Sequence, residues 1–246
     1  MGTAANESPR FGSYTTARVT VGRVERAERH AARLRRDAAR LGLPQPAQIE
    51  IESLFVEAAR SAFASDDGIL RIEWSRASED ALPELFAVPR ALGPEPDVWR
   101  VAVSGATHPG PERRRNTKHV NVPAYDLARA EISQSKFDEV LLFDANGLLV
   151  EGGRSNFILV TESGQLVTPD LALGAVEGLG LTVVLENRPE IGMARLTQDD
   201  VASAEELMSV NVVRGVVPIV ELAGRPIADG RPGAWARRLR SLFESK

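Results

Sequence analysis

Cysteine is absent from this 246-residue sequence, and histidine occurs only three times, as His30, His108 and His119. A chain without cysteine forms no disulfide and offers no thiolate to a metal ion, and this composition is typical of a cytosolic protein. Three scattered histidines also supply no cluster of imidazole ligands. We therefore expect no metal site.

Long apolar runs are missing as well. No stretch approaches the roughly 20 residues of a membrane-spanning helix, and residues 1–12 lack the apolar segment of a secretory signal. The 30 Lys and Arg residues are scattered among 34 Asp and Glu residues, which leaves a net charge of −4. Nucleic-acid binding needs clustered positive charge. We expect a cytoplasmic protein that binds neither membranes nor nucleic acids.

What is present is the composition of an ordinary globular protein, 43% hydrophobic and 26% charged. The length suffices for one large domain or two small ones. Residues 104–117 are rich in Gly, Pro and Arg and are typical of a connector. We expect an α/β (α+β) fold with an N-terminal subdomain at 12–106, a hinge at 107–117 and a C-terminal subdomain at 118–246.

Hydrophobic periodicity predicts the elements of each half. The first half is expected to contain, in order, a loose tail, a strand, two helices, a strand, an irregular segment and a strand, at residues 1–11, 14–20, 25–43, 47–64, 69–76, 77–97 and 98–104. The second half is expected to contain a helix after Pro123, then three strands and another helix, at residues 139–144, 147–152, 156–161 and 173–187.

The most informative stretch runs from Lys118 to Asn156. A lysine precedes a segment of helical period, and a strand, a turn and a second strand then end at Glu151 beside two glycines. A desolvated lysine becomes a nucleophile for carbonyl groups, and a carboxylate suits a cationic ring nitrogen such as that of a pyridoxal cofactor. The alternative is that both side chains are solvated, as Lys and Glu usually are.

Arginine follows two patterns worth noting. His30 and Arg33 are neighbours on one helix face, either as part of a solvated basic helix or as a binding pair. Arg113–Arg115 lie in the connector just before Lys118, either as solvated charges or as groups that attract a substrate carboxylate. The residues alone leave both alternatives open.

The order and spacing of these segments resemble one known family. Lys118-His119-Val120-Asn121, Asp138-Glu139, the turn at 144–147 and Glu151-Gly-Gly-Arg-Ser-Asn156 resemble the class IV aminotransferases, the fold-type IV pyridoxal-phosphate enzymes. This family includes branched-chain and D-amino-acid aminotransferases and 4-amino-4-deoxychorismate lyase. The resemblance implies two α/β subdomains with the active site in the cleft between them, and a homodimer.

The resemblance also implies roles for particular residues. Lys118 would form a Schiff base with pyridoxal 5′-phosphate (PLP), Glu151 would pair with the ring nitrogen, and Arg33 would hold the phosphate. Further cofactor contacts would come from Asn156 and from residues at two backbone turns, Leu179, Gly180, Val212 and Val213. Tyr14, Thr16 and His119 would face the substrate.

Three departures from the family pattern concern the phosphate. Gly180 and Leu181 replace a threonine and an arginine, and Val212 stands where a hydroxyl is often found. Each departure removes a side-chain contact that the family can make. A relative with weakened cofactor binding and no catalytic activity is therefore one hypothesis.

The other hypotheses are enzymatic. The phrase Tyr14-Thr-Thr-Ala-Arg18 and the pair Lys118-His119 are closer to the lyase, which releases pyruvate and 4-aminobenzoate and serves folate biosynthesis. We expect lyase-like activity first and an aminotransferase acting on branched-chain or D-amino acids as the alternative. The sequence does not choose the substrate.

Overall fold

The computed structural model describes residues 10–114 and 116–243, without the side chains of residues 113 and 114. Most of the predicted tail, residues 1–9, therefore lies outside the described residues. The chain divides into two compact units, one of Met1–Gly93 with Thr117–Val122 and one of Pro94–Asn116 with Pro123–Lys246.

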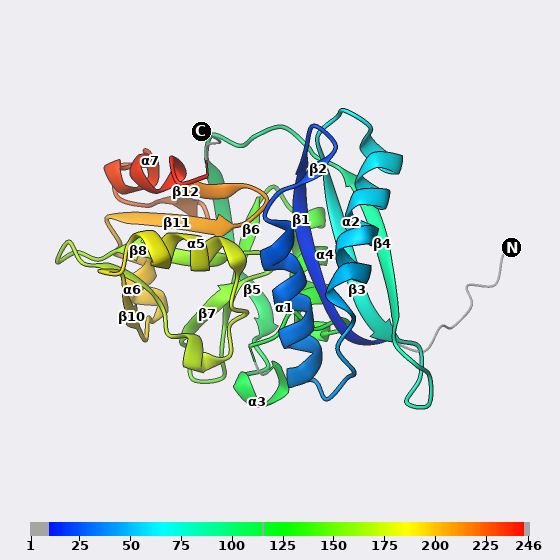
Figure 1. Cartoon of the computed structure of the whole chain (residues 1–246). Helices are drawn as coiled ribbons and strands as arrows, with labels where there is room; N and C mark the ends of the chain where they lie inside the picture. The colour runs from blue at the N-terminus through cyan, green and yellow to red at the C-terminus, as the bar shows by residue number, and fades with distance from the viewer. Residues whose placement is uncertain (1–9, 115, 244–246) are drawn as a thin grey trace, which may run out of the picture. The chain divides into compact units, whose positions relative to one another are not determined.

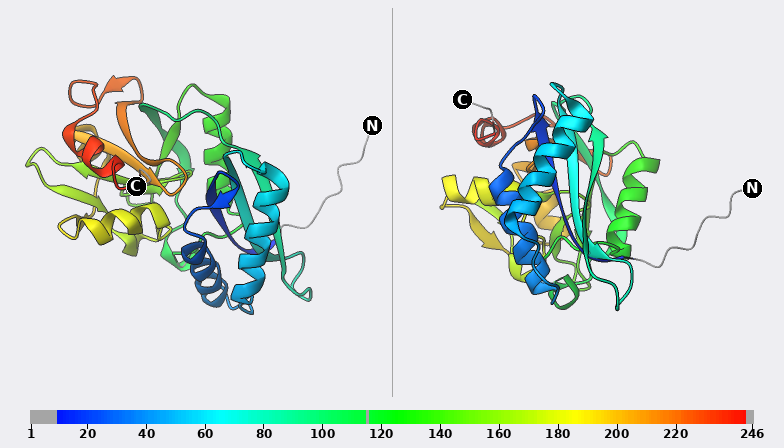
Figure 2. Two further views of the ribbon diagram at one scale, coloured as in Figure 1. Left: turned by 45° about the horizontal axis from the view of Figure 1, so that its top comes forward. Right: turned by 45° about the vertical axis from the view of Figure 1, so that its right-hand side comes forward.

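The first unit is a four-stranded sheet with two helices on one face (Figures 1 and 2). The strand order is β2-β1-β3-β4, and every pairing is antiparallel. The strands are β1 (Phe11–Thr20), β2 (Arg23–Val24), β3 (Gly68–Arg76) and β4 (Glu84–Ala91). The helices are α1 (Ala27–Arg40) and α2 (Gln48–Phe63).

Alternation along β1 explains why one face is covered. Thr15, Ala17 and Val19 are buried, and Val19 packs with Leu34 of α1 and Phe55 of α2 in one apolar cluster. Successive strand residues point to opposite faces, so Tyr14 and Thr16 lie on the other face, where they are only partly buried. This second face of β1 carries the residues predicted to meet the substrate.

The segment with Lys118 belongs to the first unit, unlike the predicted division, which placed the lysine in the C-terminal subdomain. Its backbone pairs with the edge of β1: the Tyr14 N–H donates to the Lys118 carbonyl at 2.9 Å, and Val120 N–H donates to Gly12 at 3.0 Å. The edge of β1 would otherwise expose unpaired backbone groups here.

The second unit is built on a nine-stranded mixed sheet in the order β10-β9-β8-β11-β12-β5-β6-β7, with β13 paired to β12. The strands are β5 (Trp99–Thr107), β6 (Glu139–Phe143), β7 (Leu149–Gly152), β8 (Asn156–Val160), β9 (Leu166–Pro169), β10 (Gly192–Ala194), β11 (Glu206–Asn211), β12 (Gly215–Leu222) and β13 (Arg225–Pro226). The helices are α3 (Pro111–Arg114), α4 (Pro123–Gln134), α5 (Leu179–Asn187), α6 (Gln198–Ala202) and α7 (Ala234–Arg240), with a 3₁₀ turn at Leu171–Leu173.

Two apolar clusters hold this sheet. On one side α5 and α7 pack against β11 and β12 (Figure 1), with Leu181 and Leu239 among buried residues such as Val210 and Val216. A second cluster joins Trp99 of β5 to β6, β7, β8 and α6. Helix α4 packs against β5 and β6. Among the described residues no helix is long and apolar enough to cross a membrane.

Two secondary-structure predictions were wrong. Residues 84–91 form β4 rather than irregular chain, because pairing with β3 outweighs the weak pattern around Pro89. The helix expected from residue 173 begins only at Leu179, since Gly174 has a φ of 98° and interrupts it.

Candidate functional site

Lys118 lies beside the edge of β1 in the first unit. Its backbone N–H donates to the Asp37 carboxylate at 3.1 Å, and its Nζ lies 5.0 Å from the centre of the Tyr14 ring. An ammonium at this distance from an aromatic face is attracted to the ring. The amine is therefore held at the predicted substrate-facing side of the sheet.

Arg33 and Asp37 are one turn apart on α1 and both are buried. Arg33 Nε lies 3.8 Å from Asp37 Oδ2, and its Nη2 donates to the Tyr14 carbonyl at 3.4 Å. Asp37 thus connects the predicted phosphate arginine to the backbone of Lys118. Sequence reasoning missed Asp37, although the i, i+4 spacing from Arg33 was a usable signal.

His30, the other half of the predicted pair, is a core residue. It is fully buried, its Nδ1 shares a 2.6 Å hydrogen bond with Thr15 Oγ1, and its ring packs edge-on against Phe55. Burial, followed by the positive charges of Arg33, Arg26 and Lys118, lowers the pKa of His30 to about 3. His30 is therefore a neutral packing residue below Arg33.

A second cationic side chain, which the sequence did not reveal, lies over the Tyr14 ring. The guanidinium of Arg71 in β3 lies 3.7 Å from the centre of the Tyr14 ring and donates to Glu73 at 2.5 Å. Thr16 stands opposite Arg71 in the β1–β3 register. His119, the third predicted substrate residue, packs its ring edge-on against Phe11 at 5.0 Å.

Glu151 in β7 is buried in the second unit. Its Oε1 accepts a hydrogen bond from the Tyr125 hydroxyl and another from the Val176 N–H at 3.0 Å, and His108 Nε2 lies 3.4 Å away. All three groups are donors or can act as donors, and hydrogen bonds of this kind stabilise the charged form of a carboxylate. Tyr125 and His108 were not predicted as site residues.

The turn after Glu151 is held by a second buried carboxylate. Glu139 accepts hydrogen bonds from the N–H groups of Gly153 and Arg154 and from the Ser155 hydroxyl, at 2.9 to 3.1 Å. Burial raises the pKa of Glu139, and the nearby Arg154 and the hydrogen bonds offset only part of that rise. Glu139 fixes the chain directly after Glu151.

Asn156 lies against the start of α5. Its amide donates to the Val176 carbonyl at 3.1 Å, and a Cβ added to Gly178 would overlap its Oδ1. Gly178 is the N-cap of the nine-residue α5 and provides no side-chain cap. The first N–H groups of this helix therefore have no acceptor within the helix or its cap.

Gly180 lies in the first turn of α5, against the backbone of a second turn. A Cβ at Gly180 would lie 2.5 Å from the Asn211 carbonyl carbon and 2.8 Å from the Val212 nitrogen. A threonine does not fit this approach, which explains one departure from the family pattern. The replacement of the family's arginine by Leu181 has a different reason: the Leu181 side chain is buried in the apolar cluster beneath α5.

Val213 differs from the other predicted phosphate contacts. Its N–H and that of Arg214 donate to the Asn211 side chain at 3.0 and 2.9 Å. Leu179 and Val212 are buried, and Leu179 is the first residue of α5. Val213 is therefore the least suited of the predicted set to hold an anion.

Comparison with protein families matches residues 12–222 to the class IV amino-transferase family. This chain belongs to the class IV aminotransferases. The matched range contains Lys118, Arg33 and Glu151, together with both backbone turns near Gly180 and Val212.

Curated relatives of this class IV aminotransferase include two named for branched-chain amino acids. A branched-chain-amino-acid aminotransferase of Pseudomonas aeruginosa is 29% identical over 48% of the chain and 39% of its own length. A Methanocaldococcus jannaschii protein assigned by name to the same activity is 28% identical over 66% of the chain and 58% of its own length. The chain thus spans about half the length of these relatives. A D-alanine aminotransferase of Bacillus licheniformis is 20% identical over 95% of the chain and 87% of its own length.

Solved structures confirm the predicted fold class. A branched-chain aminotransferase of Thermoproteus uzoniensis with norvaline superposes with a TM-score of 0.81 at 20% identity, covering 95% of this chain and 84% of that one. An aminotransferase of Brucella abortus bound to PLP gives a TM-score of 0.79 at 23% identity, with coverages of 99% and 91%. At these identities the likeness extends to the fold alone.

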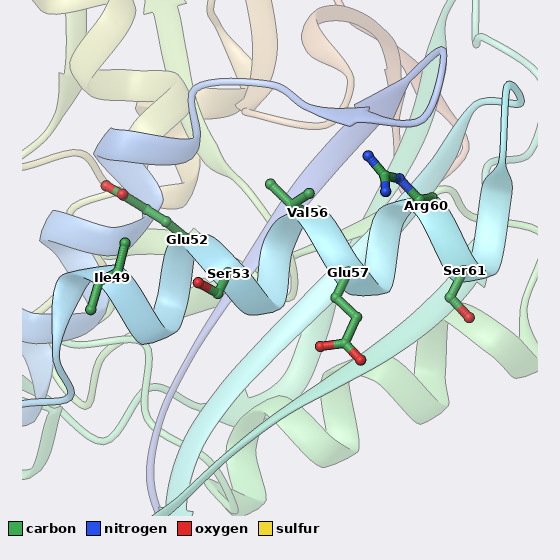
Figure 3. A pocket seen from close by; sticks show the side chains of 7 residues that line it. All are labelled: Ile49, Glu52, Ser53, Val56, Glu57, Arg60 and Ser61. Atoms are coloured by element: carbon green, nitrogen blue, oxygen red, sulfur yellow. The ribbon is translucent and has the colours of Figure 1, made fainter.

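Among the side chains that the structure describes, the remaining surface of this class IV aminotransferase adds no further group to the predicted residues. A hollow on the outward face of α2 is lined by that helix alone and contains none of them (Figure 3). In the part of the chain that the structure describes, no group of three or more acidic or histidine side chains could hold a metal ion. The side chains of Arg113–Arg115 are outside the described residues, so their predicted attraction for a carboxylate stays a prediction.

Proposed function

We propose that this chain is a PLP-dependent aminotransferase in which Lys118 bonds the cofactor and Glu151 pairs with its ring nitrogen. The observation that carries the proposal is Glu151: a carboxylate with 4% of its side chain exposed, faced by three hydrogen-bonding groups, in a member of this family. Burying an ionised carboxylate is costly unless it has partners, and such an arrangement suits a cationic ligand.

The residues of the second unit fit a phosphate group. The uncapped N-terminus of α5 supplies the N–H groups of Leu179 and Gly180, and the close approach of Val212 is possible only because residue 180 lacks a Cβ. Exposed N–H groups and the helix dipole favour an anion at such a place. We assign the phosphate to these three backbone groups and to Arg33, without Val213, and we keep Asn156 as the side chain that shapes this turn.

PLP, when bound, supplies an electron sink that stabilises negative charge on the α-carbon of an amino acid. Glu151 then holds a proton at the ring nitrogen. Lys118 accepts and returns the proton of the substrate at its Nζ, and its neighbour Tyr14 limits where that amine can move.

Arg71 is our proposal for the group that pairs with a substrate carboxylate. It shares the Tyr14 ring with Lys118, and a guanidinium has five donors, so its bond to Glu73 leaves others for a ligand. Thr16, opposite Arg71 in the register, is the predicted neighbour of the same ligand. His119 stays a prediction.

The aminotransferase reading is preferred to the lyase because of the relatives. The curated relatives described above are named for branched-chain amino acids or D-alanine. The lyase prediction depends on the phrase at 14–18 and on Lys118-His119, and none of the relatives described above is named for the lyase. We therefore propose amino acids of these two classes as substrates; the homodimer and the cytoplasmic location stay predictions.

The test is the visible spectrum of the purified protein with PLP, before and after borohydride. We expect a band that borohydride removes and fixes on Lys118, and transfer of an amino group from leucine or D-alanine to 2-oxoglutarate. Lys118→Ala should lose the band and reduce the transfer rate by about 10²–10⁴-fold while leaving the unfolding transition in place.

Lys118→Arg is the matched control, because it keeps a positive charge and removes only the nucleophile. If it retained the band, Lys118 would not be the attachment point. Pyruvate release from aminodeoxychorismate without a keto acid would instead support the lyase. A wild-type protein with no band at saturating PLP would support the non-catalytic relative.

A further inference from the structure

A chain of hydrogen bonds within the second unit ends on Glu151. His108, the residue after β5, is anchored by its backbone N–H, which donates to Phe143 at 2.8 Å. Its Nε2 lies 2.9 Å from the Tyr125 hydroxyl, and that hydroxyl donates to Glu151 Oε1. His108 and Tyr125 are both buried and their rings meet edge-on at 5.9 Å.

The other nitrogen of His108 fixes the direction of this chain. The Gly110 N–H donates to His108 Nδ1 at 3.1 Å. A backbone N–H can only donate, so Nδ1 carries no proton, and the neutral ring has its proton on Nε2. The Nε2–H therefore donates to the Tyr125 oxygen, which leaves the hydroxyl proton for Glu151.

Each bond in this chain supports the next. An oxygen that accepts a hydrogen bond becomes a stronger donor through its own proton, so His108 strengthens the Tyr125–Glu151 bond. Hydrogen bonds to a carboxylate favour its charged form and hold its rotamer. Glu151 thus depends on two side chains from outside its own strand, one after β5 and one on α4.

We propose that His108 and Tyr125 are positioning residues that keep Glu151 ionised and aimed at a cationic ring nitrogen. The role toward the ring nitrogen rests on the proposed function. The orientation of the relay, defined as His108, Tyr125 and Glu151, does not, because it can be measured without a cofactor.

Tyr125→Phe removes the hydroxyl and keeps the ring. Without that donor Glu151 would be more basic and would hold more of the proton that it shares with the ring nitrogen. A bound ring would then be less cationic, and the Nζ of Lys118 bonded to the cofactor would be more basic. We expect about a tenfold weaker affinity for PLP. We also expect the spectral pH midpoint, the pH at which the visible band of the PLP-bound protein is half titrated, to rise by about one unit.

A pair of His108 variants tests the direction of the relay. Asparagine keeps an acceptor near the Nδ1 position and loses the donor to Tyr125, so His108→Asn should shift the midpoint in the same direction as Tyr125→Phe. Glutamine can place an amide N–H near the Nε2 position, so His108→Gln should restore most of the wild-type midpoint. A purely structural role would not separate the two.

Val217→Ala is the control for lost stability. Val217 is buried in β12 and belongs to the apolar cluster around Trp99, with no part in the relay. It should lower the unfolding midpoint and leave the spectral pH midpoint unchanged. A shift equal to that of Tyr125→Phe would overturn the proposal.

The cofactor-free readout is ¹⁵N NMR of histidine-labelled protein. With three histidines in the sequence, the His108 signals can be assigned from the His108→Asn variant. We expect a protonated Nε2 and a bare Nδ1 at pH 7 in the wild type. A proton on Nδ1 would overturn the relay whether or not PLP binds.

The NMR measurement and the PLP-binding measurement distinguish a failure of the relay from a failure of the proposed function. If the wild type shows the expected tautomer but no PLP band, the proposed function fails and the relay's orientation stands. If PLP binds and neither Tyr125→Phe nor His108→Asn changes the affinity or the midpoint, the positioning role is wrong.

Discussion

At the scale of single residues, buried carboxylates make contacts that the sequence motif did not predict. Asp37 has no exposed surface, and it joins Arg33 to the backbone of Lys118. Truncating one partner of a buried ion pair leaves the other charge uncompensated. Asp37→Ala should therefore lower the free energy of unfolding by about 3–5 kcal/mol, measured by urea denaturation.

Arg36 offers the matched control for Asp37. It lies 3.3 Å from the same carboxylate, but 37% of its side chain is exposed. Exposed ion pairs contribute about 0–1 kcal/mol, so Arg36→Ala should cost far less than Asp37→Ala. Equal losses would show that Asp37 acts through the exposed arginine rather than through Arg33.

Glu139 gives a prediction about pH. Burial raises the pKa of Glu139 in the folded protein, so folding binds its proton more tightly than the unfolded chain does. Its contribution to stability is then complete below the unfolded pKa, near 4.3, and declines as the pH rises through the folded value. Relative to Glu139→Gln, which does not titrate, the wild type should lose stability over that range.

Urea titrations of both proteins between acidic and neutral pH check this sign. If the wild type instead gained stability relative to Glu139→Gln as the pH rose, the hydrogen bonds from the turn at 153–155 would outweigh burial. That result would mean that Glu139 is charged in the folded protein over this pH range.

At the scale of elements, the decisive feature is the approach of α5 to the turn at 211–212. Gly180→Thr restores the residue type expected from the family, yet its Cβ would lie within 2.8 Å of the Val212 nitrogen. We expect it to cost about 1–3 kcal/mol of stability through overpacking and to weaken PLP binding rather than improve it.

Gly192→Ala is the control, because a Cβ there meets only Val167 Cγ1 at 3.9 Å. It should change the urea midpoint little. Tighter PLP binding by Gly180→Thr would mean that the turn can open to admit the hydroxyl, contrary to the packing described above.

Sequence patterns predicted these elements to different depths. The strand β1 and helices α1 and α2 followed from clear periodicity, whereas β4 did not, because its stability comes from pairing with β3. Motif spacing singled out Lys118 and Glu151. It was silent on His108 and Tyr125, whose contact with Glu151 depends on how β5 and α4 pack, not on any local pattern.

At the scale of the whole molecule, the chain passes three times between the two units, after Gly93, after Asn116 and after Val122. It leaves the first unit after Gly93 and returns only for Thr117–Val122. Local patterns favoured a single hinge, since nothing in the sequence of 117–122 marks it as the partner of a strand a hundred residues earlier. Long-range pairing of this kind is also slow to form.

The return of the chain to the first unit has a consequence during synthesis. The sheet of β1, β3 and β4 can assemble once residue 91 has been made, but the edge of β1 at Gly12–Tyr14 keeps unpaired backbone groups until residues 118–120 emerge. The nascent first unit thus has an unpaired strand edge until the segment that pairs with it has been synthesised. That segment carries Lys118, so the residue proposed to bond the cofactor is positioned only when the edge of β1 is paired.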